Sequence, residues 1–509
     1  MIASLILSVL AGLLLGFSFP FTPPGSDVVV FLPWLAFIAP VPLFISLRRL
    51  ERPFSAWLCG FVTGYVFFYI ALFWISSFGQ LALNLLSAYL AMWFGILCVV
   101  LWVLLRFKSA SWNYLVIPAT WVAAEYLHCF GATGFPWLTL GNVSFGMKPL
   151  LQLASIGGVF AVSFFQVFVA YTIFDLFWGR AKPALRLRSA FLAALAMVAI
   201  VGWGALTYFA YTHSERKLPQ KEVALVQGGV GSLVSWSDRE FFERSQNAYV
   251  STTRHNLTRG DLPALVLWPK SAIPLVNDAR EFVLPGEEAS LWSSFPDLKL
   301  IQGMLMRDEA GRLQNVAVLL TSPAAPVGVY VKSRLVPYGE FVPLGEVARF
   351  LSYPWGKQDV NAGRSLEPLD TGKLKLAVNI CFDSIFPGVS RAQVREGASL
   401  IALITNNSWF PMPAGVKQHA MMDFFRAVEN RRPLVRAATT GVSHFILPSG
   451  RLLAATKIGE RCYLRQPVPM VKSRSFYVRF GDLFSVLCLL LAAGFFVFRA
   501  VVGVSEELF

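Results

Sequence analysis

Long runs without charged residues fill the first 212 residues of the chain and return near its C-terminus, at 479–503. A helix needs roughly 20 predominantly apolar residues to cross the hydrocarbon core of a bilayer, and these regions contain such runs repeatedly. Charged residues make up only 15% of the 509 residues, whereas soluble domains carry roughly 25%. The sequence therefore predicts an integral membrane protein.

We expect an α-helical bundle of about eight transmembrane helices. They are predicted at 2–18, 28–46, 54–78, 81–105, 112–127, 150–178, 187–212 and 479–503. The fifth is short and contains Glu125, so a re-entrant or buried interfacial helix is the alternative there. We expect three parts: a transmembrane domain with seven spans at 1–212, a domain at 213–475 that reads like a soluble protein, and a last helix with a short cytoplasmic tail at 476–509.

The charges of the loops predict the orientation. Three loops are basic, at 48–54, 106–110 and 179–188, whereas those at 20–27 and 128–149 share a single lysine. Lys and Arg are retained on the cytoplasmic side, so alternate loops are expected inside. The N-terminus is then cytoplasmic and the domain at 213–475 lies in the periplasm. No small-residue cleavage motif follows the first span, which we interpret as a retained anchor.

The net charge of +14 fits basic cytoplasmic loops that touch anionic lipid headgroups, and it does not argue for nucleic-acid binding. The chain has no C-x-x-C motif, and its five histidines show no metal-ligand spacing. We therefore expect neither a metal nor a cofactor. Of six cysteines, Cys381 and Cys462 fall in the outer domain. A disulfide between them is the alternative to free thiols, although their flanking sequences are unlike.

Short apolar segments alternate with helical patterns in the outer domain. Strands are predicted at 222–230, 264–269, 299–305, 316–322, 327–333, 374–383, 400–410, 433–439 and 442–450, and helices at 237–255, 287–293, 388–397 and 416–430. Continuously apolar strands interleaved with helices are typical of an α/β sandwich whose strands are buried on both faces. In such folds the chemistry gathers at the carboxyl ends of the strands.

Three predicted strands end in residues that can carry chemistry. Lys270 follows "LVLWP", Lys332 follows "VGVYV", and Cys381 follows "LAVNI". A cysteine at such a position is a candidate nucleophile, provided that a cation or base favours its thiolate and that donors hold the oxyanion. The two lysines are the candidate cations.

Six motifs occur in the order typical of the nitrilase superfamily: "VALVQG", "LWPKSAIP", "VKSRLVPYGEFVPLG", "NICFDSIFP", "TNNSWF" and "QHAMMDFFRAVENRRPLVRAATTGVS". The sequences of these motifs resemble those of its membrane branch, the apolipoprotein N-acyltransferases. The stretch "TGFPWLTLGN" at 133–142 is similar to that family's membrane domain, and the resemblance covers essentially the whole chain. It implies a nitrilase-like αββα sandwich on a helical bundle in the bacterial inner membrane.

The resemblance also implies a ping-pong acyl transfer without a cofactor. A cysteine, here Cys381, takes an acyl chain from a phospholipid such as phosphatidylethanolamine and passes it to the amine of a diacylglyceryl apolipoprotein. Lys332 matches the lysine that stabilises the oxyanion, and Glu340 matches the glutamate that positions it. The general-base glutamate of the family is replaced by Lys270. We expect a monomer.

Smaller departures surround the nucleophile. The family usually has an aromatic residue and a glutamate after its cysteine, and this chain has Phe382 and Asp383. In "TNNSWF", Asn407 stands where the family usually has an acid. We expect four side chains to line the substrate pocket: Trp409, Phe382, Asp383 and Tyr338.

Lys270 leaves several interpretations open. Beside Lys332 it would place two ammonium groups near Cys381 and favour a standing thiolate. An ammonium cannot accept a proton from the incoming amine unless its pKa is lowered, which two close cations can do to each other. Glu340 is an alternative base. The chain is then an active acyltransferase with an altered base or acceptor, an impaired paralogue that binds lipid or lipoprotein, or an amidase-like hydrolase.

Overall fold

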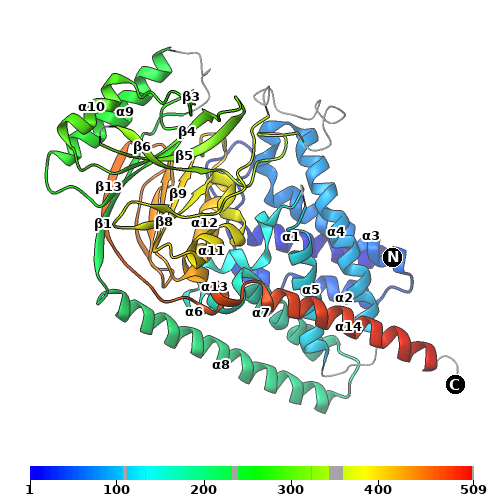
Figure 1. The fold of residues 1–509 in the computed structure, drawn as a ribbon. Coiled ribbons are helices and arrows are strands. Elements are labelled where there is room, and N and C mark those ends of the chain that lie inside the picture. Colours follow the sequence, from blue (N-terminus) through cyan, green and yellow to red (C-terminus); the bar gives the residue numbers. More distant parts are fainter. Residues whose placement is uncertain are drawn as a thin grey trace. The chain divides into compact units, whose positions relative to one another are not determined.

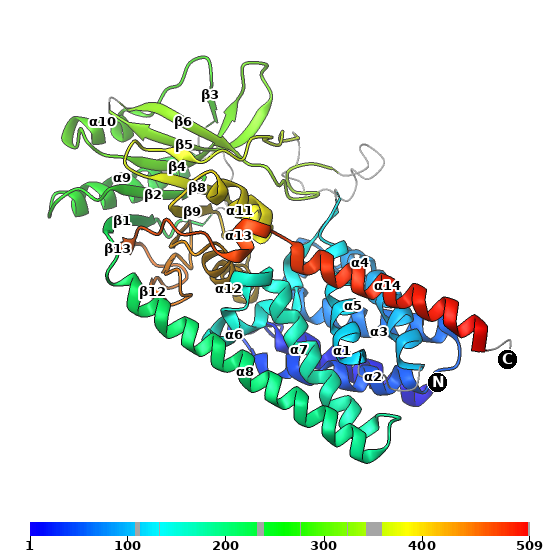
Figure 2. The same cartoon turned by 60° about the horizontal axis from the view of Figure 1, so that its bottom comes forward.

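The computed structural model describes residues 1–506 except 107–111, 132, 232–238, 275, 323 and 343–358, and it describes no side chains beyond 498. The chain divides into two compact units, drawn in Figures 1 and 2. The helical unit comprises Met1–Tyr208, Met412–Met421 and Phe480–Phe509. The α/β unit comprises Phe209–Pro411 and Met422–Arg479.

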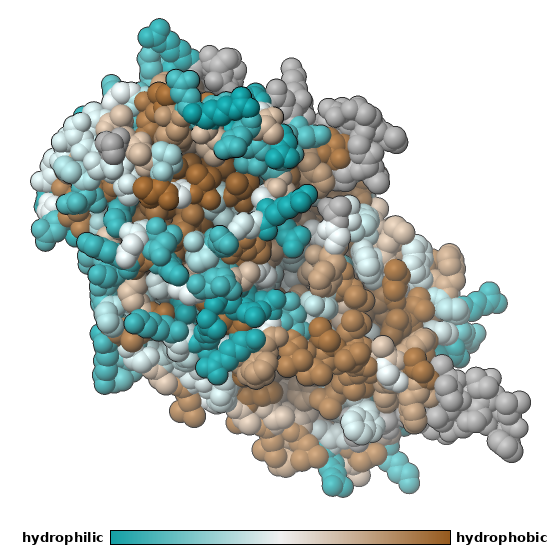
Figure 3. Space-filling model, viewed as in Figure 1, coloured by the Kyte–Doolittle hydropathy of each residue, from teal (hydrophilic) through white to brown (hydrophobic). Residues whose placement is uncertain are grey.

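Nine α-helices lie wholly or mostly in the helical unit among the described residues, and each predicted span overlaps at least one of them, although the span at 28–46 overlaps only the short α2. They are α1 (Ile2–Ser18), α2 (Pro40–Arg48), α3 (Pro53–Ala71), α4 (Gln80–Arg106), α5 (Asn113–Leu127), α6 (Lys148–Leu151), α7 (Ala154–Trp178), α8 (Pro183–Glu215) and α14 (Leu483–Glu506). Among the described residues α3, α4, α7 and α8 are long and apolar enough to cross a membrane, and three shorter apolar helices accompany them. Apolar side chains cover much of the face of this unit that Figure 3 shows. The predicted membrane helical bundle is confirmed as a fold.

Glycines let α3 pack closely against two neighbours. A Cβ atom on Gly12 of α1 would lie 2.7 Å from the carbonyl oxygen of Thr63, and one on Gly60 would lie 2.5 Å from the Cβ of Cys98 in α4. Thr63 Oγ1 also donates to the carbonyl oxygen of Ser8 at 3.0 Å. Small residues at such contacts allow the van der Waals packing that holds helices together in lipid.

The side chain of Gln418 is enclosed within the helical unit by four hydrogen bonds. Its Oε1 accepts from the indole nitrogens of Trp74 at 3.0 Å and Trp137 at 2.8 Å. Its Nε2 donates to the carbonyl oxygens of Pro20 at 2.7 Å and Ala71 at 2.6 Å. A buried amide with all these partners satisfied fixes the segment Met412–Met421 in this unit.

Two sheets form the centre of the α/β unit. The first has the order β13-β1-β2-β4-β5-β6, with β3 paired to β4, and the second has the order β12-β11-β10-β9-β8-β7. The strands of the first are β1 (Gln220–Gln227), β2 (Leu265–Lys270), β3 (Val276–Asp278), β4 (Leu300–Arg307), β5 (Leu313–Thr321), β6 (Ala325–Val331) and β13 (Cys462–Pro469). Those of the second are β7 (Leu369–Asp370), β8 (Lys375–Ile380), β9 (Leu400–Thr405), β10 (Leu434–Ala438), β11 (His444–Ile446) and β12 (Leu452–Ala455).

Apolar side chains from both sheets form one core between them, including Leu267 of β2, Val378 of β8 and Ile404 of β9. The helices cover the outer faces: α9 (Arg239–Leu257) and α10 (Gly286–Ser294) lie on the first sheet, and α11 (Pro387–Arg395) lies on the second. The remaining helices are α12 (Pro413–Asn430) and α13 (Phe476–Phe480). The unit is therefore the predicted αββα sandwich.

Helix α10 carries a buried carboxyl group in its first turn, that of Glu288. Burial raises the pKa of Glu288 to about 8, and the nearby amide of Gln302 opposes this only in part. The group is thus largely neutral at neutral pH and is a local cost to stability at higher pH.

All nine predicted strands are present, but β3, β7, β12 and β13 were not predicted. β13 runs antiparallel to β1 along its whole length, with Cys462 opposite Gln227. Its residues are mostly half-buried, and the mixed sequence "CYLRQPVP" lacks the continuous apolar pattern of the central strands. Cys462 and Cys381 are both free thiols.

Candidate active site

The topology brings two of the predicted strand ends, those of β2 and β6, to the same edge of the first sheet. β2 and β4 are parallel, and β6 runs parallel to both because two antiparallel pairings separate it from β4. Lys270 is the last residue of β2, and Lys332 follows β6 directly. A Cβ atom on Gly303 of β4 would lie 2.6 Å from the Cα of Lys270 and 2.8 Å from Ile404 Cδ1 in the other sheet, so a glycine is required where the layers approach.

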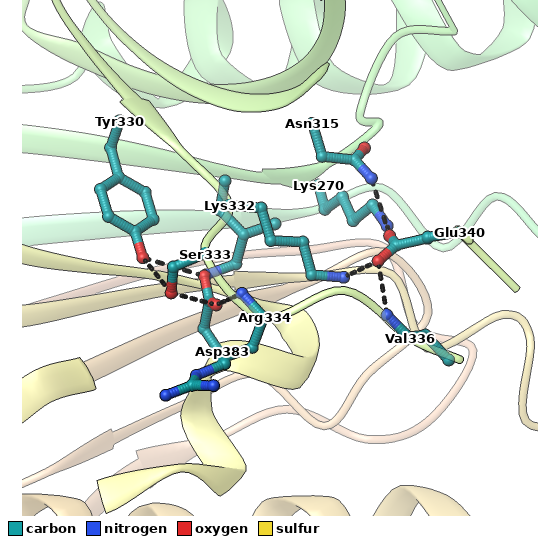
Figure 4. Close-up of polar contacts among 10 residues, drawn as sticks. Lys270, Asn315, Tyr330, Lys332, Ser333, Arg334, Val336, Glu340 and Asp383 are labelled. Carbon is teal, nitrogen blue, oxygen red and sulfur yellow. Dashed lines mark hydrogen bonds and ion pairs between the residues drawn. The ribbon is translucent and has the colours of Figure 1, made fainter. Parts of the chain in front are cut away.

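Both lysines bind one carboxylate, that of Glu340 (Figure 4). Oε1 of Glu340 accepts from Lys270 Nζ at 2.7 Å and from Asn315 Nδ2 at 2.7 Å. Oε2 accepts from Lys332 Nζ at 2.5 Å and from the backbone N–H of Val336 at 3.0 Å. The side chain of Lys332 is 0% exposed, that of Glu340 10% and that of Lys270 14%. Two buried ammonium groups therefore share a single negative charge.

Backbone hydrogen bonds hold this loop in place. The N–H of Lys332 donates to the carbonyl oxygen of Asn315 at 2.8 Å, and its own carbonyl oxygen accepts from Gly363 at 2.8 Å. The carbonyl oxygen of Glu340 accepts from Val360 at 2.9 Å. Strand β5 and the segment around 360–363 thus fix both ends of the lysine–glutamate pair.

Electrostatics favour the charged forms of Glu340 and Lys270. Burial alone would raise the pKa of Glu340, but Lys270 and Lys332 outweigh it and bring the pKa to about 2. Burial alone would lower the pKa of Lys270, but the negative charges of Glu340 and of the Cys381 sulfur raise it above its ordinary value. The lowering of the pKa of Lys270 considered for two bare lysines does not occur, because the carboxylate of Glu340 lies between them.

The same geometry argues against Glu340 as a general base. Each of its oxygens already accepts two hydrogen bonds, and its pKa of about 2 makes it a very weak base. Glu340 is instead suited to orient the lysines.

Cys381 begins the turn that follows β8, and its φ of 53° lies in the left-handed region. Side chains other than glycine avoid this region, at a cost of roughly 1–2 kcal/mol. The residue is half-buried and packs against the core between the sheets. Strained backbone positions of this kind occur often at active sites, which supports the prediction that Cys381 is the nucleophile.

Asp383 connects the cysteine turn to the loop of Lys332 (Figure 4). Its Oδ1 accepts from Ser333 Oγ at 2.9 Å and from the N–H of Arg334 at 2.7 Å. Its Oδ2 accepts from the hydroxyl of Tyr330 at 3.1 Å and the N–H of Ile380 at 3.1 Å. Burial raises the pKa of Asp383 above its ordinary value despite the opposing charge of Lys332. The carboxylate positions the nucleophile's turn relative to Lys332.

The other three residues expected in the pocket lie around this centre in different ways. Phe382 is buried and packs edge-on against Phe386, with ring centroids 5.3 Å apart. Tyr338 is half-buried, has a φ of 61°, and its N–H donates to the carbonyl oxygen of Phe341 at 2.7 Å. Trp409 is half-buried in the segment after β9. Their contact with a substrate stays a prediction.

Sequence reasoning missed the residues that complete the network, chiefly Asn315, Tyr330 and Ser333. One signal was available: Asn315 is a polar side chain at the start of the apolar run "VAVLL", where burial requires a partner. Among the described residues no group of three or more His, Cys, Asp or Glu side chains could hold a metal ion.

The fold and the site define a class: a membrane protein with a carbon-nitrogen hydrolase domain of the nitrilase superfamily. Residues 222–464 match the family model "Carbon-nitrogen hydrolase", and residues 11–172 match "Apolipoprotein N-acyltransferase N-terminal domain". The chain is 32% identical to the apolipoprotein N-acyltransferase of Geobacter metallireducens, covering 96% of this chain and 94% of the relative. It is 29% identical to that of Chlorobaculum tepidum, covering 95% and 94%. The chain belongs to the apolipoprotein N-acyltransferase family.

Solved structures similar to the chain include Saccharomyces cerevisiae Nit3, a member of branch 10 of the nitrilase superfamily. It is 17% identical with a TM-score of 0.40, covering 50% of this chain and 91% of Nit3. An amidase from Nesterenkonia sp. is 17% identical with a TM-score of 0.36, covering 52% of this chain and 94% of the amidase. The family membership, which rests on the sequence matches, confirms the predicted resemblance and the class of acyltransferase in lipoprotein biosynthesis.

Proposed function

We propose that this chain is an active N-acyltransferase, which transfers an acyl chain from a phospholipid through a Cys381 thioester to the N-terminal diacylglyceryl-cysteine of apolipoproteins. The observation that supports activity is the ion cluster of Lys270, Glu340 and Lys332. Desolvating such charges costs several kcal/mol each unless they are paired well. A site without function would have no reason to keep this arrangement of buried charges at the strand ends beside a strained cysteine.

Each group has a role that its surroundings favour. Cys381 is the nucleophile. Lys332, fully buried and oriented by Glu340, supplies a preorganised cation for the oxyanion of the tetrahedral intermediates. The two ammonium groups favour negative charge on the groups around them, which include the Cys381 sulfur and Asp383.

The substrates and the setting follow the family. A phospholipid such as phosphatidylethanolamine is the donor, and an amine on a membrane-anchored apolipoprotein is the acceptor. The proposed location is the bacterial inner membrane, with a cytoplasmic N-terminus and the α/β unit in the periplasm; the apolar helices and the basic loops support it. The monomer is the proposed state.

The second candidate is an impaired paralogue that binds lipid or lipoprotein. One observation favours it, namely the lysine at position 270, where the family's base is a glutamate. An amidase-like hydrolase is the third, and the membrane domain disfavours it because a soluble amide needs no bilayer.

The test uses the purified protein in mixed micelles with phosphatidylethanolamine. Intact mass should show a thioester adduct that is absent in Cys381→Ser, and a synthetic diacylglyceryl-cysteine peptide should then remove the acyl chain and become N-acylated. The measurement covers pH values from roughly 6 to 9, because this range includes the shifted titrations of thiols and amines. If no adduct forms at any of these pH values, the proposal is contradicted. The same proposal can be tested in cells. An active enzyme should restore growth of a strain depleted of its own N-acyltransferase.

A further inference from the structure

We propose that Lys270 carries the proton of both half-reactions, acting first as general acid toward the leaving alcohol and then as general base toward the incoming amine. This inference rests on the proposed function and assigns the step that the missing glutamate would perform. It makes Lys270 a catalytic residue rather than a remnant.

The geometry leaves few groups that could move this proton. Both oxygens of Glu340 are occupied, and Asp383 accepts four hydrogen bonds from the protein. The ammonium of Lys332 is fully buried. Lys270 is the more exposed of the two lysines, at 14%. An ammonium has three N–H donors, and one of those on Lys270 points to Glu340, which leaves two for the reacting atoms.

Hydrogen bonds connect Lys270 to the turn of Cys381. Glu340 binds both Lys270 and Lys332, and Asp383 accepts from Ser333, directly after Lys332, and from the N–H of Ile380, directly before Cys381. In the proposed cycle the state that reacts has a thiolate at Cys381 and an ammonium at Lys270. It holds the same number of protons as the thiol and carboxylate of the usual arrangement, so no proton has to be gained or lost before reaction.

In the first half-reaction the thiolate attacks the ester carbonyl of the phospholipid. A C–S bond forms, the C–O bond to the glycerol breaks, and the ammonium of Lys270 gives its proton to the departing alkoxide. The products are the thioester, the lysophospholipid and a neutral Lys270 amine. The thioester carries no charge, so one influence that raised the pKa of Lys270 disappears as the proton leaves.

In the second half-reaction the neutral amine of the acceptor attacks the thioester. A C–N bond forms, the C–S bond breaks, and the extra proton on nitrogen passes to the neutral Lys270 amine. The products are the amide, the Cys381 thiolate and the Lys270 ammonium, which is the resting state. Atoms and charges balance over the cycle without a further base.

The test compares two acyl donors that differ only in the leaving group. A phospholipid releases an alkoxide that needs a proton, whereas a p-nitrophenyl ester of the same acyl chain releases a stabilised phenolate that needs none. The decisive variant is Lys270→Arg, because arginine keeps the positive charge for Glu340 and for the thiolate but does not give up its proton. Lys373→Met, at an exposed turn, is the matched control.

In Lys270→Arg we expect the rate of Cys381 acylation by phospholipid to fall by about 10²–10⁴-fold, the usual contribution of general acid–base catalysis, while acylation by the p-nitrophenyl ester stays near the wild-type rate. Lys270→Met serves if the arginine variant does not fold. Equal slowing with both donors would make Lys270 a positioning residue, and unchanged rates with both would make it a bystander; either result overturns the proposal. A wild-type protein that accepts the p-nitrophenyl ester but never N-acylates the peptide would contradict the proposed function instead.

Discussion

Lys270 and Lys332 donate hydrogen bonds to opposite oxygens of the same carboxylate, at 2.7 and 2.5 Å. This relationship changes the meaning of the substitution at position 270. The family pattern sets two glutamates around one lysine, whereas this chain sets two lysines around one glutamate. The cluster gains two units of positive charge and can keep its proton count only if the sulfur carries the negative charge.

Glu340→Gln should destabilise the α/β unit and abolish acylation of Cys381. Removing the carboxylate takes away the counter-charge that both buried lysines share, and breaking a buried ion pair in this way costs about 3–5 kcal/mol. Denaturant unfolding measures the loss. Glu367→Gln, an exposed position, is the control, and equal stability of the two variants would contradict the buried cluster.

The contribution of Glu340 should also depend on pH. The pKa of its carboxyl is lowered to about 2, while an unfolded glutamate titrates near 4.3. Its stabilising effect is therefore fully present above about pH 4.3 and is lost as the pH falls toward 2. The stability difference between wild type and Glu340→Gln should shrink over that window, and a difference that stays constant would argue against the lowered pKa.

Glu288→Gln should stabilise the protein at alkaline pH. The pKa of Glu288 is raised to about 8, so the stability of the wild type is fully present below about pH 4.3 and declines as the pH rises toward 8. The stability of the glutamine variant should not decline in this way, because a glutamine side chain does not ionise. Thermal unfolding at pH values from about 5 to 9 spans the titration, and Glu287→Gln at the exposed neighbouring position should follow the wild type.

Lys270→Glu should restore the family's base and retain acyl transfer, but it should change the resting state of the sulfur. A carboxylate at position 270 favours the thiol, so alkylation of Cys381 by iodoacetamide should need a higher pH than in the wild type. Identical alkylation profiles would contradict the thiolate. Loss of both transfer and folding would show that the cluster tolerates no second carboxylate.

Asp383→Asn should slow acylation of Cys381 and lower stability. The amide can accept at only one of the two positions that Asp383 now offers to Ser333, Arg334, Tyr330 and Ile380. A buried donor left without its acceptor costs about 1–3 kcal/mol. Unfolding and single-turnover acylation measure the two effects, and Asp359→Asn, an exposed position, is the control.

Much of the fold could be predicted because its central strands and membrane helices have simple apolar patterns. The strand ends that carry Lys270, Lys332 and Cys381 were predicted for the same reason. The contact of Glu340 with Lys332 was expected from the resemblance, but its contact with Lys270 could not be predicted, because it depends on the path of an irregular loop after β6 and on the side chain of Asn315 in another strand. The strand β13 was missed because its burial comes from pairing with β1 rather than from its own composition.

The φ of 53° at Cys381 also bears on the history of the chain. Glycine adopts this conformation without the steric cost that a cysteine incurs. If the sulfur had become dispensable, random substitution toward glycine or asparagine would have relaxed the turn and been favoured by stability alone. A strained cysteine at this turn therefore supports a role for its sulfur.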